Sequence, residues 1–372
     1  MHRFLISILL ITLLGTACRF ETPITPLIDH PSGNLPLLSE GKQLGLIASF
    51  NLDDSPALQD SIGTRWQEAL DAGMGIGRVQ LDWRDLEADS GQYDPVALIQ
   101  SLSDLSAQEL DLFASVMAYD SEGPVMPDYL SDLPINHPRV IARFQALMDW
   151  VVPIVREHRG WCLSIANEAD NFFGEVEGIE EELLDFLVAI RDYVHEIDPD
   201  LAVTVTMAEG NIDVKPETMR DLIAAVDVAA INFYGSNLRN PRKPQGPRTL
   251  RRELRQLLDF CGEKNIVFQE LGMHSNASRL NSSGAIQRDF FQTVFEFMDQ
   301  EPRLRAAYVF QLVDWSPATI DLITEDFLEE NPSLESFIED YRQSLGSIGL
   351  IEFATGHQKP AWGEVISWLE RW

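Results

Sequence analysis

The most regular feature of the sequence is an alternation of short apolar runs with longer segments in which apolar residues recur every three or four positions. Short runs are typical of buried strands, and the longer spacing is typical of helices that bury one face. The runs that predict strands are 44–50, 77–81, 112–117, 161–166, 201–207, 226–233, 266–269 and 306–312. The helical spacing covers 61–72, 140–154, 180–196, 250–261, 285–299 and 364–369. Strict alternation of this kind predicts a parallel sheet.

The number of strand–helix units narrows the fold class. Eight units of about 40 residues each fit an α/β fold of the (β/α)8 type, the TIM barrel. A doubly wound open sheet is the alternative, although it usually contains fewer strands. No linker divides the chain, so we predict a single TIM-barrel domain over residues 41–372, with an acidic insertion at 321–347 after the eighth strand.

The first 40 residues have a different pattern. Arg3 precedes the apolar residues 4–14, and small residues then lead to Cys18. A secretory signal peptide has this arrangement, and its apolar stretch is too short for a stable membrane-spanning helix. Residues 1–18 resemble a bacterial lipoprotein signal with its cleavage site, which predicts lipidation of Cys18. Simple secretion, with Cys18 near the cleavage point, is the alternative. Residues 19–40, rich in Pro, Thr and Ser, predict a flexible tether.

Charge and cysteine content limit the partners. The chain has 59 acidic residues against 28 Lys and Arg, a formal net charge of -31. Such a protein is a poor ligand for nucleic acid and anionic lipid, so we expect it to contact a membrane only through a lipid on Cys18. The signal-like residues 1–18 predict export and an anchor on a bacterial membrane, with the protein facing the periplasm or exterior. Cys162 and Cys261 are expected to be buried free thiols, although an exported protein could pair them. Nothing in the spacing of Cys and His predicts a metal site, and no cofactor is expected.

The candidate chemistry lies at the ends of the predicted strands. One apolar run ends in Asn167-Glu168, and another brings Glu270 to its carboxyl end. Core packing does not explain a carboxylate there, whereas a barrel gathers these ends around one pocket. The residues at the eight ends are Asn51, Asp53, Asp82, Trp83, Tyr119, Asn167, Glu168, Glu209, Tyr234, Glu270, Asp314 and Trp315. Rings suit the apolar faces of a sugar, and paired carboxylates suit cleavage of a glycosidic bond.

In order and spacing, these residues resemble the retaining glycoside hydrolases of clan A, such as families 5 and 53. Asn167-Glu168 matches the pair that ends the fourth strand in that clan, and Glu270, within Gln-Glu-Leu-Gly, matches the end of the seventh. The resemblance implies that Glu168 is the acid/base and that Glu270 is the nucleophile. It also implies that Tyr234 hydrogen-bonds the nucleophile and that Arg78 lies beside it.

The same resemblance implies the substrate contacts. Asn167 is expected to bind the sugar 2-hydroxyl, and Trp315 and Trp83 are expected to form platforms for the sugar. The sequence departs from the pattern at Ala166, where Gly is common, and no clear His ends the third strand. These departures leave the family, the sugar and the linkage open.

The predicted function is retaining hydrolysis of a β-linked oligo- or polysaccharide by a monomeric enzyme with two catalytic glutamates. A rival from another class is a carbohydrate-binding or scaffolding lipoprotein that kept the barrel and lost turnover, because fold alone does not fix function. A barrel enzyme of unrelated chemistry is a third hypothesis. It would require phosphate-binding glycines after the seventh and eighth strands, and Gly272 alone is insufficient.

Overall fold

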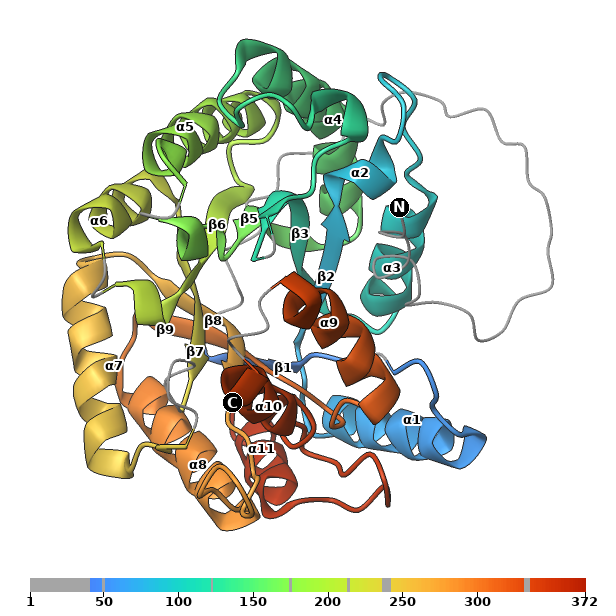
Figure 1. Cartoon of the computed structure of the whole chain (residues 1–372), viewed down its shortest axis with the longest axis vertical. Coiled ribbons are helices and arrows are strands. Elements are labelled where there is room, and N and C mark those ends of the chain that lie inside the picture. The colour runs from blue at the N-terminus through green and yellow to red at the C-terminus, as the bar shows by residue number, and fades with distance from the viewer. Residues whose placement is uncertain are drawn as a thin grey trace.

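A ring of strands surrounded by helices makes up the computed structural model (Figure 1). It describes residues 41–48, 51–121, 123–173, 176–212, 215–235, 242–330 and 335–372. The predicted signal peptide, the tether and Cys18 lie outside these residues. Within the described ranges, no helix has the length and apolar character needed to cross a membrane.

The strands of the described residues form one sheet. They are β1 (Gln43–Leu46), β2 (Ile76–Asp82), β3 (Asp111–Asp120), β4 (Gly123–Pro124), β5 (Gly160–Asn167), β6 (Ala202–Ala208), β7 (Ala229–Tyr234), β8 (Ile266–Gly272) and β9 (Leu304–Val309). All except β4 are parallel to their neighbours, in the order β1-β9-β8-β7-β6-β5-β3-β2. Strand β4 pairs antiparallel with the end of β3. The predicted (β/α)8 barrel is therefore confirmed.

The barrel comes together where β1 meets β2. Gly45 in β1 approaches β2 so closely that a Cβ atom added to it would lie 2.5 Å from the carbonyl oxygen of Ile76. A glycine in a strand often marks such a close backbone approach. The absence of a side chain at Gly45 thus lets the first and second strands lie side by side.

Helices cover the outside of the barrel (Figure 1). The helices of the described residues, including those of the insertion after the last strand, are α1 (Pro56–Asp71), α2 (Trp83–Leu86), α3 (Val96–Ser106), α4 (Pro138–Glu157), α5 (Ile179–Ile197), α6 (Pro216–Ala225), α7 (Pro247–Cys261), α8 (Gly284–Gln300), α9 (Pro317–Glu330), α10 (Glu335–Leu345) and α11 (Pro360–Leu369). Three short 3-10 turns are η1 (Asp128–Leu130), η2 (Ala169–Phe172) and η3 (Glu209–Asn211). Helices α3 and α6 were not predicted from the sequence.

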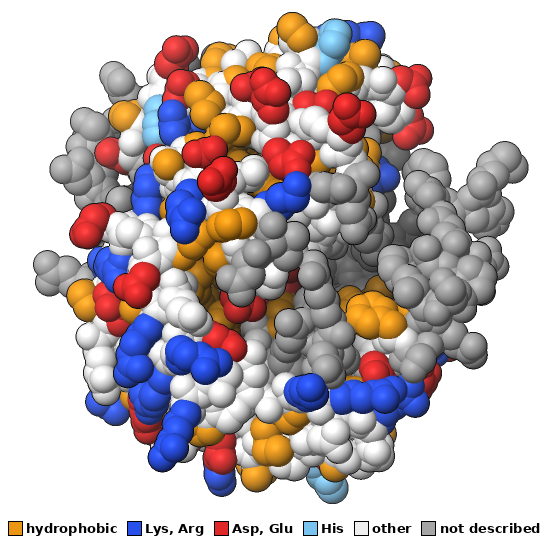
Figure 2. Space-filling view, turned by 60° about the vertical axis from the view of Figure 1, so that its left-hand side comes forward, with side chains coloured by type: hydrophobic (Ala, Val, Ile, Leu, Met, Phe, Trp, Pro, Cys, Tyr) orange, Lys and Arg blue, Asp and Glu red, His pale blue; other side chains and the backbone are white. Residues whose placement is uncertain are grey.

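Helix α7 illustrates how the sequence turns one helix face toward the barrel. Leu250, Leu254 and Leu258 are buried, and their spacing places them on one stripe of the helix. Arg248 and Arg252 are exposed to solvent. Figure 2 shows that Lys and Arg side chains gather on one part of the surface even though the formal net charge is -31.

The barrel interior changes from apolar to polar along the strands. A small apolar cluster fills its amino-terminal half, where the Phe113 ring contacts Trp161 and Tyr308 at centroid distances of 5.8 and 5.9 Å. Two residues further along the strands, on the same faces, lie the buried side chains of Ser115, Ser164, Thr204, Asn232 and Gln269. The carboxyl ends of the strands therefore stand above a polar layer, with an aromatic floor beneath it.

The predicted insertion after the last strand forms α9 and α10. Helix α10 packs against the loop after β8, where Asn276 donates to Gln343 at 2.9 Å and Arg279 forms an ion pair with Asp340. Both segments follow carboxyl ends of strands, so the insertion lies on the same side of the barrel as the polar layer.

Candidate active site

An irregularity in β8 turns two consecutive polar residues toward the interior. Side chains along a strand normally alternate between its faces. The pairing of β8 with β7, however, passes from Phe268 directly to Glu270. A β-bulge of this kind places two residues opposite one, so that Gln269 and Glu270 both reach Arg78 on β2.

Glu270 is held by two hydrogen-bond donors. Arg78 Nη1 donates to Glu270 Oε1 at 3.1 Å, and the Tyr234 hydroxyl donates to Oε2. Burial raises the pKa of Tyr234 well above its ordinary value, and the negative charge of Glu270 adds to this effect. The tyrosine therefore keeps its proton and remains a donor. Both contacts suit a carboxylate that carries a negative charge.

Tyr234 reaches Glu270 across a glycine. A Cβ atom added at Gly272 would lie 2.8 Å from the Tyr234 ring and 2.8 Å from the carbonyl oxygen of Phe310. Any side chain there would displace the ring or the next strand. Gly272, predicted only as part of a motif, is thus a steric requirement of the Tyr234–Glu270 contact.

A chain of amides joins the surroundings of the two glutamates. With its amide oriented to satisfy both neighbours, Gln269 accepts from Nε and Nη2 of Arg78 at 2.5 and 2.7 Å and donates to Asn232 Oδ1 at 2.5 Å. Asn232 Nδ2 in turn donates to Glu168 Oε1 at 2.7 Å. The partner of one glutamate is therefore connected to the other glutamate through Gln269 and Asn232.

Glu168 lies in a different environment from Glu270. It follows β5 with a left-handed backbone (φ 51°), and its carboxyl group accepts hydrogen bonds from Asn232 and from Asn171, the latter at 3.2 Å. Burial raises the pKa of Glu168 to about 8, and the charge of Glu270 contributes in the same direction. Glu168 is therefore mainly protonated at neutral pH, while Glu270 is paired with a cation.

Asn167 is fixed beside Glu168 by two further polar residues. Its Nδ2 donates to Asp120 Oδ1 at 2.8 Å, and its Oδ1 accepts from Asn232 Nδ2 at 3.4 Å. The sequence prediction included neither Asp120 nor Asn232. The available signal for Asn232 was its position two residues before Tyr234, which places both on one face of the strand.

The two predicted tryptophan platforms differ in position. Trp315 is half-buried, donates to Gln311 at 2.7 Å and packs edge to face on Phe310, which also contacts the Tyr234 ring. Trp83 is fully buried. Its indole donates to Glu87 at 2.9 Å, and its ring packs on Phe144 of α4 at 4.9 Å.

The position of Trp83 corrects the sequence prediction. A fully buried ring has no free face for a sugar, so the structure contradicts a platform role for this residue. The cause is α2, which begins at Trp83 directly after β2 and directs its ring into the layer between the strands and the helices.

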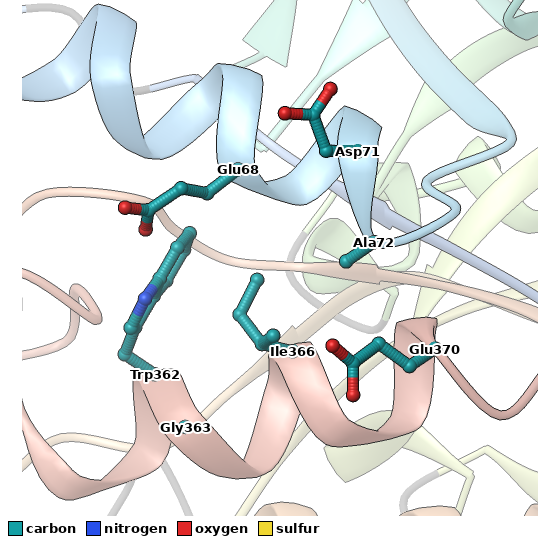
Figure 3. A pocket seen from close by; sticks show the side chains of 7 residues that line it. All are labelled: Glu68, Asp71, Ala72, Trp362, Gly363, Ile366 and Glu370. Atoms are coloured by element: carbon teal, nitrogen blue, oxygen red, sulfur yellow. The ribbon is translucent and has the colours of Figure 1, made fainter.

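Two hollows lie away from this site. One, of about 320 Å³, lies between α1 and α11 (Figure 3). It is lined by Glu68, Asp71, Ala72, Trp362, Gly363, Ile366 and Glu370. The other, of about 360 Å³, lies between α7 and α8. Neither contains a predicted site residue, and neither faces the carboxyl ends of the strands.

Cysteines and metal-binding groups add no further chemistry to the described residues. Cys162 and Cys261 are buried free thiols, as predicted. Over the ranges that the structure describes, no three His, Cys, Asp or Glu side chains are grouped so as to hold a metal ion.

Comparisons with known proteins give no match by sequence and clear matches by structure. No protein-family model matches the chain, and a search of curated proteins finds no match. An exo-β-1,4-mannosidase from Opitutaceae bacterium strain TAV5 has a TM-score of 0.64 at 14% identity, covering 89% of this chain and 59% of that one. The chain thus spans about three-fifths of the length of that mannosidase.

Other solved structures are similar in fold at comparably low sequence identity. A GH5_18 variant from Streptomyces cattleya, in complex with Manβ1-4GlcNAc, has a TM-score of 0.65 at 14% identity, covering 89% of this chain and 81% of that one. The apo structure of a β-glucosidase has a TM-score of 0.57 at 13% identity, covering 84% of this chain and 89% of that one. The protein therefore shares the barrel fold of these glycoside hydrolases.

Replacing Glu168 by Gln tests the protonated state of this residue without a substrate. The pKa of Glu168 is raised from 4.5 to about 8, so the native chain keeps a proton that the unfolded chain releases. The wild type therefore loses stability as the pH rises through this window. We expect the free energy of unfolding of Glu168→Gln, relative to the wild type, to increase by about 2 kcal/mol between about pH 5 and pH 8.5. The increase is smaller than a fully buried acid would give, because Glu168 is partly exposed to solvent.

Urea unfolding followed by circular dichroism measures this difference at the two pH values. Any hydrogen bond lost in the amide variant contributes equally at both, so only ionisation changes the comparison. Glu217→Gln, at an exposed position on α6, controls for the loss of one carboxylate. If the wild type and Glu168→Gln differ by the same free energy at both pH values, Glu168 is not a protonated buried acid.

Proposed function

We propose that the protein is a retaining β-glycoside hydrolase in which Glu168 is the acid/base and Glu270 is the nucleophile. The observation that carries this proposal is the contrast between two connected glutamates. Glu270 is paired with Arg78 and Tyr234, whereas burial keeps Glu168 protonated at neutral pH. One carboxyl group held by cationic and hydroxyl donors, beside another that burial keeps protonated, provides a nucleophile and a proton donor.

The reaction proceeds in two displacements. In the first, Glu270 attacks the anomeric carbon while Glu168 gives its proton to the departing oxygen, and the sugar becomes covalently linked to Glu270. In the second, Glu168, now a carboxylate, takes a proton from water. The water oxygen bonds to the anomeric carbon and releases Glu270. Two inversions at the same carbon give net retention.

The neighbouring side chains hold the reactants in place. Asn167, fixed by Asp120, binds the sugar 2-hydroxyl, a contact that strengthens in the transition state. Arg78 and Tyr234 hold Glu270 and stabilise its charge when it leaves the sugar. The half-buried ring of Trp315 serves as the platform for a sugar. Trp83, whose ring is fully buried, has no such role.

The structural relatives suggest the first substrates to test. Their names and bound ligands include an exo-β-1,4-mannosidase, Manβ1-4GlcNAc and a β-glucosidase. Aryl β-mannosides and β-glucosides with a dinitrophenyl leaving group are therefore the first probes, followed by β-linked oligo- and polysaccharides. We propose that the enzyme acts on such sugars as a monomer and without a cofactor.

The unequal roles of the glutamates give a test that separates an enzyme from a binding protein. Glu270→Ala removes the nucleophile and should reduce turnover of every substrate by several orders of magnitude. Glu168→Ala removes only the proton donor, so a dinitrophenyl glycoside, whose leaving group needs no proton, should still glycosylate Glu270. Added azide should then speed turnover and give a β-glycosyl azide, detectable by NMR.

Two results would contradict these assignments. Equal loss of turnover in both variants, without azide rescue, would show that the two glutamates do not have different roles. Oligosaccharide binding by the wild type, without cleavage of any probe, would instead favour the carbohydrate-binding lipoprotein. Glu217→Ala, at an exposed position on α6, controls for loss of a carboxylate elsewhere.

We further propose that the protein is exported and anchored by a lipid on Cys18. The support is the signal-like pattern of residues 1–18 and the Pro-, Thr- and Ser-rich stretch that follows. Cys18→Ser should move the protein from the membrane fraction to the soluble fraction of the bacterial host, because the variant lacks the thiol to which the lipid would be attached. A Cys18→Ser protein that remains with membranes as the wild type does would contradict lipidation.

A further inference from the structure

A second buried carboxylate lies next to the proposed acid/base, and the reaction described above does not use it. Asp170 is only 3% exposed. It accepts hydrogen bonds from the backbone N–H of Ala208, at 3.1 and 3.3 Å to its two oxygens, and from Asn211 Nδ2 at 2.9 Å. Asp170 thereby ties the turn after β5, which begins at Glu168, to the turn after β6.

The hydrogen bonds continue from Asp170 to Glu168. Asn211 Nδ2 also donates to Asn171 Oδ1 at 2.7 Å, and Asn171 Nδ2 donates to Glu168 Oε2 at 3.2 Å. Asn171 accepts through its side-chain oxygen and donates through its nitrogen, so the position of Asn211 constrains Asn171, and Asn171 constrains Glu168. The chain ends on the carboxyl group that must transfer the proton.

The backbone of Glu168 explains why such support is needed. Its left-handed conformation (φ 51°) is unfavourable for an L-residue, because the Cβ atom comes too close to the following carbonyl oxygen. Such a conformation persists only where the surroundings enforce it. The N–H of Glu168 donates to Thr206 at 2.8 Å, and the N–H of Asn171 donates to the carbonyl oxygen of Glu168 at 3.0 Å. The side-chain contacts add to this backbone support.

We propose that Asp170, Asn211 and Asn171 form a positioning relay that holds the Glu168 carboxyl group and, through the charge on Asp170, controls when Glu168 releases its proton. The catalytic meaning of the relay rests on the proposed function. The relay itself is a property of the folded chain and can be tested without turnover.

Ionisable and charged groups from several elements lie around Glu168 and its neighbours. Glu270 on β8 and Tyr234 on β7 interact electrostatically with Glu168. Arg78 on β2 is paired with Glu270, Asp120 on β3 accepts from Asn167, and Glu209 begins η3, which contains Asn211. Glu270 and Asp170 both raise the pKa of Glu168 through their negative charge, after the larger effect of burial. Burial also raises the pKa of Asp170, to about 7.

The hydrogen bonds to Asp170 favour its ionised form, because both of its oxygens accept from N–H donors on Ala208 and Asn211. Once Asp170 is ionised, its negative charge opposes the ionisation of Glu168. Asp170 therefore helps Glu168 to remain an acid toward pH 8. Asn171 has the opposite effect on the pKa of Glu168. Its side-chain N–H stabilises the ionised form of Glu168 and so lowers this pKa.

Two neighbouring substitutions should consequently move the pKa of Glu168 in opposite directions. Asp170→Asn removes the charge but keeps an oxygen that can accept from Ala208, and it should lower the pKa of Glu168. Asn171→Ala removes the donor without changing any charge, and it should raise this pKa. We expect each shift to be roughly half a unit or more. A general increase in the mobility of the loop would not shift the pKa of Glu168 in opposite directions in the two variants.

The measurement is a 13C NMR titration of the full chain with glutamate labelled at its side-chain carboxyl carbon. Glu168→Gln identifies the signal of Glu168. Asp259→Asn, at an exposed position near the C-terminal end of α7, is the matched control that should cause no shift. Opposite shifts in Asp170→Asn and Asn171→Ala support the relay. Unchanged values, or shifts of the same sign, overturn it.

The two substitutions differ in how strongly they are expected to destabilise the fold. Asn171 is exposed, so Asn171→Ala is a mild change. If Asp170→Asn does not fold, the absence of a rise in Asn171→Ala still overturns the proposal.

The pH dependence of hydrolysis separates this inference from the proposed function. The basic limb of kcat/KM for an aryl glycoside should move in each variant in the same direction as the NMR value. If the two variants shift the pKa of Glu168 in opposite directions but the protein hydrolyses no glycoside, the relay is supported and the proposed function fails. If the protein hydrolyses a glycoside but neither variant changes the pKa of Glu168, the function is supported and the relay is overturned.

Discussion

Two carboxyl groups that share a buried site cannot both ionise without strong mutual repulsion, and this constraint explains the arrangement around them. Charge is poorly screened where protein replaces water. The structure places the guanidinium of Arg78 against Glu270, whereas the carboxyl group of Glu168 accepts from the neutral amides of Asn171 and Asn232. Burial and the charge of Glu270 keep the proton on Glu168 at neutral pH, while Glu270 is paired with the guanidinium of Arg78.

The fold supports this asymmetry at several levels. The aromatic floor around Phe113 fills the amino-terminal half of the barrel and leaves the polar layer at its carboxyl ends. The bulge in β8 turns Gln269 and Glu270 toward the same guanidinium, and Gly272 leaves room for the Tyr234 ring. Burying these polar groups is costly unless each is paired, so the amide chain through Asn232 serves stability as well as chemistry.

Comparison with the sequence shows which features a pattern of residues can reveal. The eight barrel strands were predictable because strands covered on both faces are continuously apolar, as in β5. Glu168 and Glu270 stood out because a carboxylate ended such a run. Helix α3 was missed because Val96 and Ile99, exposed by 63% and 38%, blur its apolar period. Helix α6, with ten residues, offers few repeats of the helical spacing.

Other parts of the site depend on geometry that the sequence does not display. Gln269 and Asn232 lie inside apolar runs, and only the bulge and the strand pairing bring them to Arg78 and Glu168. Trp83 follows a strand as a pocket residue would, yet the short helix that begins there buries its ring against Phe144. Position at a strand end therefore predicts the region of a side chain but not its direction.

The central claim is that Glu270 forms a covalent bond to the sugar, and trapping that bond is the most direct test. A 2-deoxy-2-fluoro-β-glycoside with a dinitrophenyl leaving group should react slowly and release the sugar more slowly still, because fluorine destabilises the positively charged transition state of both steps. Mass spectrometry of the digested protein should find the fluorosugar on the peptide that contains Glu270, and Glu270→Gln should abolish the adduct. An adduct on another residue, or cleavage of the parent glycoside with inversion, would contradict the account.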